Sequence, residues 1–495
     1  MEAQKNPPFR VVIAGAGLVG LTAAHILTKA GIDFVILEKH KTVVPAVGSV
    51  MTIWPQTFRI FEQLGLNDVL SPLLETLNTN TVISADDASE LDVSRFPDLI
   101  ERNHGWAVRV LVRTKFIEAL YDSLPQEAKA KVLLGRHVED VEMDDTGVKM
   151  TCRGGFVERG DMLIGADGVR SQTRLHMESL RQNKAPSDLA DKYQKPYLST
   201  YRVLVAQVDT LPDVSTNIKY DGVRYGVTTQ FMYGKQVSCM AVYEKLETPT
   251  SDHHRYTDED KMDMLRRWGH LMVLPGYSVR DLHEKSKTNI GLYDCEEGLV
   301  ERWHHGRIVL VGDAVRKLDP HTGQGYNEGV TDLVVLLNNV RKMLLASSQG
   351  VESAPSTARL EAVFAKYEAE RMKQMGAVLE ISKAFARMAA WLSWKDMVMA
   401  KYVQPYLPLN YLSMTYIIGP MIAGSPVLEW LEERRLPPGK MAWRHHPKLV
   451  EAPPGKEPSK EAMSAPGVAV FTKWAWAKGA RALSAVAGHR FQWRS

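Results

Sequence analysis

The sequence predicts an α/β fold in which a mostly parallel sheet is interrupted by an inserted, mostly antiparallel sheet and followed by a C-terminal helical region. The first observation is a strand–helix–strand pattern over residues 10–38. The second is a change, at about residue 190, to short β-rich segments broken by Pro, Gly and Asp. The third is a buried-strand pattern that returns at Arg307 and runs into a long amphipathic helix.

The first unit can be assigned in order along the chain. Residues 10–14 (RVVIA) form a continuous apolar run, as in a buried parallel strand. A helix is expected from Leu18 to Lys29, with Gly31 as its cap, and Asp33–Glu38 is the second strand. A strand–helix–strand unit of this kind is typical of a Rossmann-type nucleotide-binding domain.

Later segments complete the expected organisation. Residues 111–124 read as a helix, and the run from Met162 (MLIGADGVRS) reads as a buried strand that enters a loop. Because this pattern returns at Arg307, the first domain is expected to be discontinuous. The expected parts are residues 1–185 (first part of the nucleotide domain), 186–300 (β-rich substrate domain), 301–385 (second part and long helix), 386–440 (apolar helical region) and 441–495 (linker, with prolines from 447 to 466, and basic aromatic tail).

Composition excludes several classes of function. The 495 residues are 45% hydrophobic and 24% charged, with a net charge of +3 that gives no reason to expect a nucleic-acid partner. Cys152, Cys239 and Cys295 lack the spacing of a disulfide framework or zinc site, so we expect a reducing compartment and no metal. The N-terminal residues do not resemble a secretory signal, and we expect an intracellular protein.

A glycine-rich turn follows the first strand. Gly15, Gly17 and Gly20 have G-x-G-x-x-G spacing between a strand and a helix. Gly15 would permit the tight turn, Gly17 the approach of a pyrophosphate, and Gly20 close helix–strand packing. Glu38 ends the second strand, where an acid bonds a ribose diol and disfavours a 2′-phosphate. The turn and the acid together predict a dinucleotide site; on its own, Glu38 could be a solvated charge.

Two further motifs distinguish flavin from nicotinamide binding. With GADGVRS (Gly165–Ser171) and GDAVRKLDPHTGQG (Gly312–Gly325), the chain resembles the aromatic-hydroxylase-type, or group A, FAD-dependent monooxygenases over about residues 9–385. Within this resemblance it is most similar to fungal enzymes that epoxidise prenyl chains of indole diterpenes and meroterpenoids. The resemblance implies that FAD is held by these residues: Gly48, Arg113, Asp167, Asp313, Gly323, Gly325 and Tyr326.

Those residue types suit a flavin. A carboxylate at Asp313 can accept hydrogen bonds from ribityl hydroxyls, although a capping role is the alternative. Gly323 and Gly325 leave room for the ring, and a helix that starts near Asn327 would direct its positive end there. Asp167 is expected to order its loop rather than to react. The chain departs from the family pattern at Thr52, Arg316 and Tyr326, which we expect to reshape the ring pocket.

The resemblance also implies the reaction. A reduced nicotinamide, expected to be NADPH, visits transiently, and one oxygen atom of O2 is inserted into a hydrophobic organic substrate. We take Arg202 and Tyr220 as the catalytic candidates, because of their position relative to the GADGVRS motif in similar enzymes. The alternative is that Arg202 is a surface charge and Tyr220 a packed side chain. His321 is a further candidate because it lies within the motif Gly312–Gly325, here called the Gly-Asp segment.

The C-terminal region suggests either a packed helical cap or a membrane contact. Residues 402–428 carry no charge but are interrupted by prolines, which argues against a straight spanning helix. The tail interleaves basic residues with Trp474, Trp476 and Trp493, as in segments that lie on anionic lipid, or in a disordered basic tail. A peripheral contact with a cytoplasmic membrane face is therefore one expectation.

The leading hypothesis is an FAD- and NAD(P)H-dependent monooxygenase that epoxidises a prenyl alkene. The alternatives are hydroxylation or dearomatisation of a phenolic or indole ring, a flavoprotein oxidase or reductase without oxygen insertion, and an inactive FAD-binding scaffold. The sequence does not specify the substrate, its regiochemistry, the choice of nicotinamide or the oligomeric state.

Overall fold

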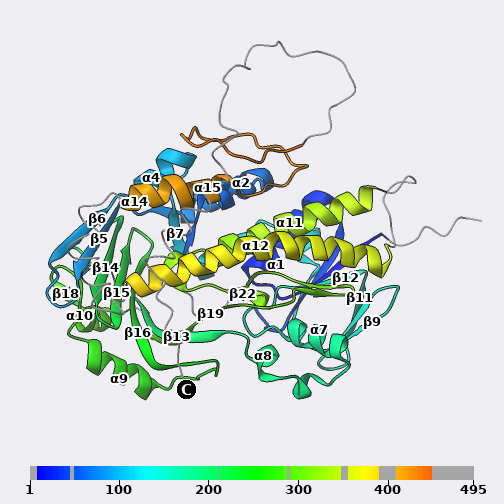
Figure 1. The fold of residues 1–495 in the computed structure, drawn as a ribbon, viewed down its shortest axis with the longest axis horizontal. Helices are drawn as coiled ribbons and strands as arrows, with labels where there is room; N and C mark the ends of the chain where they lie inside the picture. The colour runs from blue at the N-terminus through cyan, green and yellow to red at the C-terminus, as the bar shows by residue number, and fades with distance from the viewer. Residues whose placement is uncertain are drawn as a thin grey trace, which may run out of the picture.

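A computed structural model describes residues 8–44, 49–209, 211–286, 290–346, 355–389, 398 and 409–448. Figure 1 shows a β-rich lobe on one side and the parallel sheet with its helices on the other. Helix α12 (Thr357–Ala389) extends across the molecule from the side of the parallel sheet to the side of the β-rich lobe (Figure 1). The predicted α/β class, with an inserted antiparallel sheet and a C-terminal helical region, is confirmed.

The first sheet is built from distant parts of the chain. Strand β1 (Arg10–Ala14) pairs in parallel with β2 (Asp33–Glu38) and with β12 (Met162–Gly165). Strand β21 (Ile308–Leu310) then pairs in parallel with β12, so the chain returns to this sheet after the inserted lobe. The sheet order is β20-β21-β12-β1-β2-β8, with β20 at His304–His305 and β8 at Val132–Leu134.

Helices α1 and α11 cover this sheet and place its loops. Helix α1 (Leu18–Ala30) ends at Gly31, whose φ of 67° and N–H bonds to Leu27 and Thr28 carbonyls make the predicted cap. Helix α11 (Gly325–Leu345) is buried along almost its whole length and packs against α1 and α12. Because the strands are parallel, the turn after β1 and the carboxyl end of β2 lie at the same edge of the sheet.

The second sheet has the order β22-β19-β13-β16-β15-β14-β5-β6. Two of its strands precede residue 185: β5 (Thr79–Ser84) pairs in parallel with β14 (Ile218–Arg224), and β6 (Glu90–Ser94) lies outside β5. These half-exposed strands have no strong apolar alternation, so no sequence pattern indicated them. The other strands are β13 (Leu198–Gln207), β15 (Val227–Tyr233), β16 (Ser238–Thr250), β19 (Gly291–Leu299) and β22 (Arg316–Lys317).

The two faces of this sheet have different neighbours. One face carries Leu204, Phe231 and Val242, which form a buried cluster with residues of α9 (Asp258–Trp268) and α10 (Val279–Glu284). The opposite face carries a separate cluster around Val203 and Tyr243. Since side chains alternate along a strand, a shift of one residue moves a side chain from one face to the other.

The short C-terminal helices form a packed cap. Helices α14 (Leu409–Ser413) and α15 (Gly419–Ala423), with a π-helical turn between them, pack on α4 (Phe96–His104), and α15 also contacts α2 (Pro55–Leu64). Met414 and Ile422 are buried there with Ile100. No helix among the described residues combines the length and apolar character needed to cross a membrane. The basic aromatic tail lies outside the described residues.

Residues 424–448, here called the C-terminal strap, are held by side chains of the main body. The Gln63 amide accepts a 2.9 Å hydrogen bond from the Leu428 N–H and donates one of 2.8 Å to the Leu428 carbonyl. Arg59 forms a buried ion pair with Glu433 at 2.7 Å and donates to the carbonyl of His445, which lies within the segment expected to be a linker.

Candidate functional site

The turn after β1 requires its glycines. Gly15 has a φ of +101°, and a Cβ there would lie 2.8 Å from the carbonyl oxygen of Ala166. A Cβ on Gly20 would lie 2.0 Å from the carbonyl oxygen of Gly15. By contrast, a Cβ on Gly17 would meet nothing within 4 Å. Gly15 and Gly20 therefore permit close backbone packing, whereas Gly17 keeps open space in front of the amino end of α1, where phosphate groups bind well.

Glu38 lies beside this turn. Its Oε2 accepts a 2.8 Å hydrogen bond from the backbone N–H of Ala16, and its Oε1 accepts one of 2.8 Å from the N–H of His40. The His40 ring also contacts Oε1 at 2.6 Å, a partner that the sequence did not suggest. The carboxylate is therefore fixed at the edge of the turn, as an acceptor for ribose hydroxyls must be.

Asp313 lies in a charged cluster drawn from distant segments. It follows β21, and its Oδ2 forms a 2.7 Å ion pair with Nζ of Lys317. Burial alone would raise the pKa of Asp313, but the charges of Lys317, Arg113 and Arg316 hold that pKa below its ordinary value. Arg113 begins helix α5 (Arg113–Asp122) and is exposed. The structure thus brings Asp313 and Arg113 together, and adds Lys317.

The amino end of α11 completes this cluster. A Cβ on Gly325 would lie 3.9 Å from Oδ1 of Asp313, so the carboxylate faces the first turn of the helix. Gly323 has a φ of +61°, and a Cβ there would lie 1.8 Å from Oγ1 of Thr52. That hydroxyl donates a 3.0 Å hydrogen bond to the Gly323 carbonyl, and the Asn327 amide donates to the same oxygen at 2.9 Å. Thr52 therefore fixes the Gly-x-Gly turn.

Tyr326 does not present its side chain to this site. Its hydroxyl lies 2.9 Å from Oγ1 of Thr22 in α1, and its ring packs edge-on against Phe116, with centroids 5.3 Å apart. The residue is only 9% exposed. The expectation that this side chain binds the cofactor needs correction: α11 is buried on almost every side, and position 326 falls on the side that packs against α1.

Asp167 orders the loop after β12, as expected. It accepts hydrogen bonds from Oγ of Ser171 at 2.5 Å and from the N–H of Thr173 at 2.9 Å. Ser171 in turn caps helix α7 (Gln172–Gln182) by accepting the N–H of Arg174. Gly48, the remaining expected cofactor residue, lies outside the described residues.

Arg202 and Tyr220 lie on the other face of the β-rich sheet. Nε of Arg202 forms a 2.7 Å ion pair with Glu244, which also pairs with Arg267 of α9. Tyr220 packs against the buried cluster that contains Phe231. The structure therefore does not bring either residue to the glycine turns, because both fall on the alternate positions that face α9 and α10.

The face that meets the Gly-Asp segment carries Tyr243. The rings of Tyr243 and His321 have centroids 3.9 Å apart. Nδ1 of His321 lies 2.5 Å from Oδ1 of Asp319, and Nε2 lies 3.4 Å from Oγ1 of Thr228. Burial raises the pKa of Tyr243 well above its ordinary value, so this tyrosine stays protonated. The signal available in the sequence was an Asp-x-His spacing just before the Gly-x-Gly turn.

These residues fit a dinucleotide better than a metal. Among the described residues, no group of three or more His, Cys, Asp or Glu side chains could hold a metal ion. Open space at Gly17, a carboxylate at Glu38, and the cluster of Asp313, Lys317 and Arg113 match the phosphate, ribose and ribityl parts of FAD.

Comparison with known proteins agrees with this geometry. The family model described as "FAD binding domain" matches residues 9–365 of this chain. The FAD-dependent monooxygenase srdH of Neurospora crassa is 29% identical over 84% of this chain and 94% of its own length. The FAD-dependent monooxygenase paxM of Penicillium paxilli is 29% identical over 83% and 86%. Klebsiella pneumoniae HpxO complexed with FAD and uric acid superposes with a TM-score of 0.65, at 19% identity over 85% of this chain and 98% of that one.

Proposed function

The chain belongs to the FAD binding domain family, and from that premise we propose that it is an FAD-dependent monooxygenase acting on a hydrophobic secondary metabolite. The observation that carries the proposal is the convergence of the Gly15–Gly20 turn, Glu38 and the Asp313 cluster on one edge of the parallel sheet. Bound FAD, reduced by NADPH or NADH, would supply the activation of O2. The named residues would bind and orient it.

For the proton step we propose His321 in place of Arg202 and Tyr220. Asp319 contacts Nδ1, so the other ring nitrogen, Nε2, is directed toward Thr228. An imidazole oriented by a carboxylate is an efficient general acid or base. The Tyr243 ring packs against the His321 ring at a tilt of 34° and, being buried, limits the access of water from that side. His321 would hold or deliver a proton at Nε2, and Asp319 would act as its positioning residue.

The proposed reaction is epoxidation of a terminal prenyl alkene in a fungal terpenoid or meroterpenoid pathway. Support comes from the resemblance of the sequence motifs and from relatives such as paxM, which are named as FAD-dependent monooxygenases. The alternative within the same class is hydroxylation or dearomatisation of a phenolic or indole ring, because the fold is shared with FAD-complexed proteins that bind polar rings. HpxO, whose structure holds both FAD and uric acid, is an example.

One experiment separates these proposals. Purified FAD-loaded protein is incubated with NADPH, ¹⁸O2 and a panel of prenylated and phenolic substrates, and the products are analysed by mass spectrometry. We expect a single ¹⁸O atom in an epoxide of a prenylated substrate. Label in a hydroxylated ring would support the alternative, and NADPH oxidation without label in any product would support an oxidase or reductase. A flavin that no nicotinamide bleaches would indicate an inactive scaffold.

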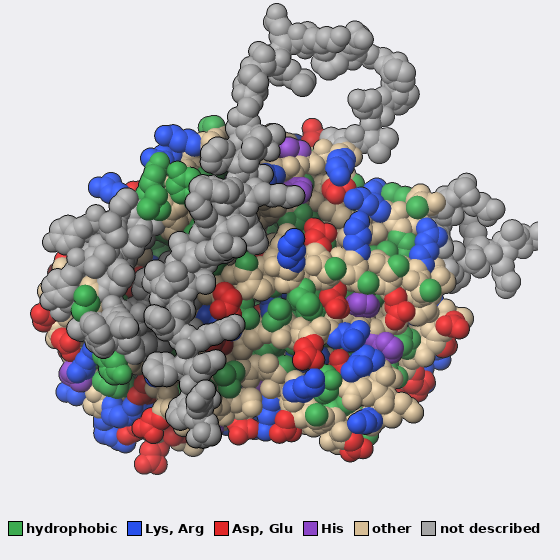
Figure 2. Space-filling model, viewed as in Figure 1, with side chains coloured by type: hydrophobic (Ala, Val, Ile, Leu, Met, Phe, Trp, Pro, Cys, Tyr) green, Lys and Arg blue, Asp and Glu red, His purple; other side chains and the backbone are tan. Residues whose placement is uncertain are grey.

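We also propose that the C-terminal cap contacts a membrane surface. On its outer side, Tyr411, Leu412 and Tyr416 are 47%, 42% and 67% exposed. Figure 2 shows hydrophobic side chains over the region that α14 and α4 occupy in Figure 1. Aromatic and aliphatic side chains of this kind suit the interface of a bilayer. Flotation with anionic vesicles tests this: a Tyr411→Ser, Leu412→Ser, Tyr416→Ser variant should bind less than the unsubstituted protein, and equal binding would contradict the proposal.

A further inference from the structure

A row of polar side chains crosses the face of the β-rich sheet that meets the Gly-Asp segment. Its first member is Thr228 of β15, which contacts His321. Gln230 lies two residues further along β15 and therefore on the same face. Asp221 of β14 is paired with Gln230 in the antiparallel register and accepts a 2.9 Å hydrogen bond from its amide. From the spacing of residues and strands, Asp221 lies about 8 Å along the sheet from Thr228.

Lys219 is the last member of this set, here called the polar row: Thr228, Gln230, Asp221 and Lys219. Its Nζ forms an ion pair with Oδ2 of Asp221, while Gln230 donates to Oδ1. Each carboxylate oxygen can accept a second hydrogen bond, because it carries two lone pairs. The side chains of Lys219 and Asp221 remain 19% and 26% exposed, although they lie on the face that meets the Gly-Asp segment. The acid is therefore oriented by its neighbours and is still accessible to a ligand.

Apolar side chains lie beside the polar row. Ala241 of β16 is paired with Gln230, and it belongs with Tyr243 to the buried cluster on this face. The ring of Tyr243 packs against His321, so this cluster reaches the same histidine as the polar row does. A molecule that lies along this face from His321 to Asp221 meets apolar side chains on one side and a carboxylate at its far end. Such a surface suits an elongated amphipathic substrate.

The charge of Asp221 also acts on the Gly-Asp segment and its neighbours. Burial is the main reason that the pKa of Tyr243 lies well above its ordinary value, and the negative charges of Asp319 and Asp221 raise this pKa further. Asp221 therefore acts on the same tyrosine as the carboxylate that orients His321. A substrate that fills this region displaces water from Asp221. A carboxylate that loses its water and gains no hydrogen-bond donor in exchange costs free energy.

We propose that Asp221 selects the substrate by accepting a hydrogen bond from a ring N–H or a hydroxyl group at the end of the substrate that is remote from the reacting alkene. The inference rests on the proposed function, which puts the alkene beside the Gly-x-Gly turn. Lys219 and Gln230 are positioning residues, because they hold the carboxylate from both sides. A substrate without the donor leaves Asp221 desolvated and without compensation, so the site discriminates against it. The substrate class is thus a prenylated molecule with a neutral hydrogen-bond donor at its polar end.

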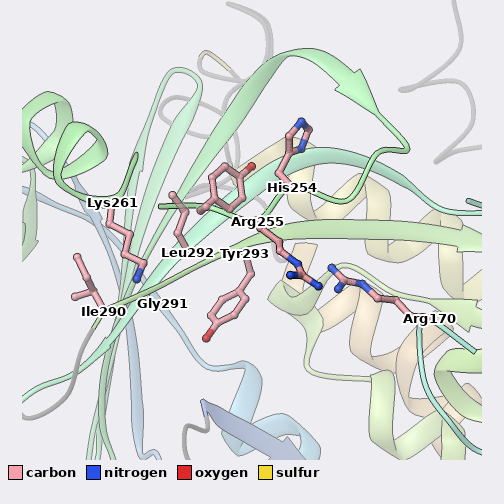
Figure 3. Close-up of a pocket in the computed structure, with 9 residues that line it drawn as sticks. Arg170, His254, Arg255, Lys261, Ile290, Gly291, Leu292 and Tyr293 are labelled. Carbon is pink, nitrogen blue, oxygen red and sulfur yellow. The ribbon is translucent and has the colours of Figure 1, made fainter. Parts of the chain in front are cut away.

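A pocket of about 390 Å³ beside the start of β19 provides a matched control (Figure 3). Its lining includes Lys261, which forms a 2.7 Å ion pair with Asp258. In the sheet order, β13, β16 and β15 separate β19 from β14, the strand that carries the pair of Lys219 and Asp221. Asp258→Asn and Lys261→Met therefore alter an ion pair of the same composition at a distance from the polar row.

The test titrates FAD-loaded full-length protein with substrate in the absence of a nicotinamide and follows the flavin absorbance, which gives a dissociation constant that does not depend on turnover. Two pairs of compounds are matched in size: a prenylated indole with the corresponding benzofuran, in which oxygen replaces the N–H, and a prenylated phenol with the corresponding aryl fluoride. In the wild-type protein the donor compound of one pair should bind about tenfold more tightly than its partner, as expected for a hydrogen bond to a charged group. Asp221→Asn should reduce this preference to about threefold, because a neutral acceptor forms a weaker hydrogen bond. Lys219→Met should retain the preference, because the carboxylate is still present.

The outcomes are distinct. The pair of compounds that shows the preference identifies the donor as N–H or hydroxyl. Equal binding within both pairs by the wild-type protein overturns the inference, and this comparison needs no substitution, so it decides the matter even where a variant does not hold FAD. An undiminished preference in Asp221→Asn overturns the inference as well. An equal loss of preference in Asp258→Asn or Lys261→Met would put the polar end of the substrate in the pocket beside β19 and would also overturn it.

The proposed function is tested separately by ¹⁸O in the product. Compounds that bind without a preference and still gain the label would remove the inference and leave the proposed function in place. Absence of binding by all four compounds, with no label in any product, would count against both.

Discussion

Nζ of Lys317 lies 2.7 Å from Oδ2 of Asp313, at the amino end of the helix that begins with Gly325. The cation and the helix end both stabilise the ionised carboxylate, which can then accept hydrogen bonds from a polyhydroxyl chain. Asp313→Asn keeps the shape but removes the charge, and we expect it to weaken FAD binding by about 10- to 100-fold. Fluorescence titration of apoprotein with FAD measures this. Asp263→Asn on α9 is the control, and an equal affinity for FAD in both variants would contradict the assignment.

The same pair predicts a flat pH dependence. The pKa of Asp313 lies below its ordinary 3.8, so the contribution of its charge is complete above that value and is lost as the pH falls through the lowered pKa. The pKa of Lys317 lies above its ordinary 10.5 because of Asp313, so its contribution is complete below that value and is lost as the pH rises through the raised pKa. The difference in FAD affinity between wild type and Asp313→Asn should therefore stay constant from about pH 5 to about pH 9. A change within that range would show that the pair is broken when FAD binds.

The Asp319–His321 contact predicts loss of turnover without loss of cofactor. His321→Asn should lower the rate of product formation by about 100-fold or more, because general acid–base groups contribute on that scale. Asp319→Asn should have a smaller effect, since the imidazole remains. His270→Asn, at an exposed position beyond α9, serves as the control. The rates of NADPH oxidation and of product formation are compared in each variant. Product formation at the wild-type rate in His321→Asn would mean that another group carries out the proton transfer.

Local patterns explain why the nucleotide turn could be predicted from the sequence. Gly15, Gly31 and Glu38 are determined by their own strands and helices, so their roles follow from spacing. The face of the sheet on which the Arg202 side chain lies depends on which side of the strand is covered by α9, and no sequence pattern near residue 202 indicates this. Tyr326 was unpredictable for another reason: α11 is buried on nearly all sides, so its periodicity does not identify a cofactor-facing side.

The close approach of Thr52 and Gly323 predicts strong coupling between two substitutions. Gly323→Ala should destabilise the protein by more than the roughly 1–2 kcal/mol that a left-handed backbone costs other residues, because the new Cβ meets the Thr52 hydroxyl. Thr52→Ala removes that hydroxyl, so the double variant should be more stable than the sum of the single effects, by about 0.5–3 kcal/mol. Urea unfolding measures the cycle. Gly31→Ala, where φ is +67° but the space is open, should be additive with Thr52→Ala.

The buried charge network around Asp332 predicts a graded loss of stability. Asp332 is fully buried, pairs with Arg371 at 2.8 Å and also with Arg316. Asp332→Ala leaves two buried guanidinium groups without this partner and should destabilise the protein by about 3–5 kcal/mol. Arg316→Met should cost less, because Arg371 still neutralises the carboxylate. Asp263→Ala, at a half-exposed position on α9, should stay within about 0.5 kcal/mol. The order of the unfolding free energies is the measurement, and a larger loss for Arg316→Met would show that Arg316 is the principal partner.

The burial of His104 against the C-terminal strap predicts that the stability of the protein falls in acid. Its ring is fully buried, has no hydrogen-bond partner among the described residues, and lies 5.3 Å from the Trp443 ring of the strap. Burial lowers its pKa from 6.5 to about 4. The unfolded chain therefore takes up the proton at a higher pH than the folded one, and stability must fall as the pH drops from 6.5 toward 4, by about 3 kcal/mol in all. His104→Phe keeps the apolar contact and should lack this loss.

The measurement compares the wild-type protein with His104→Phe. Burial also lowers the pKa of His25 and His176, so both proteins will lose some stability in acid, and the difference between their losses isolates the contribution of His104. Urea unfolding at pH 7.5 and pH 5 gives that difference, and parallel losses in the two proteins would mean that the His104 site opens to water before the ring is protonated.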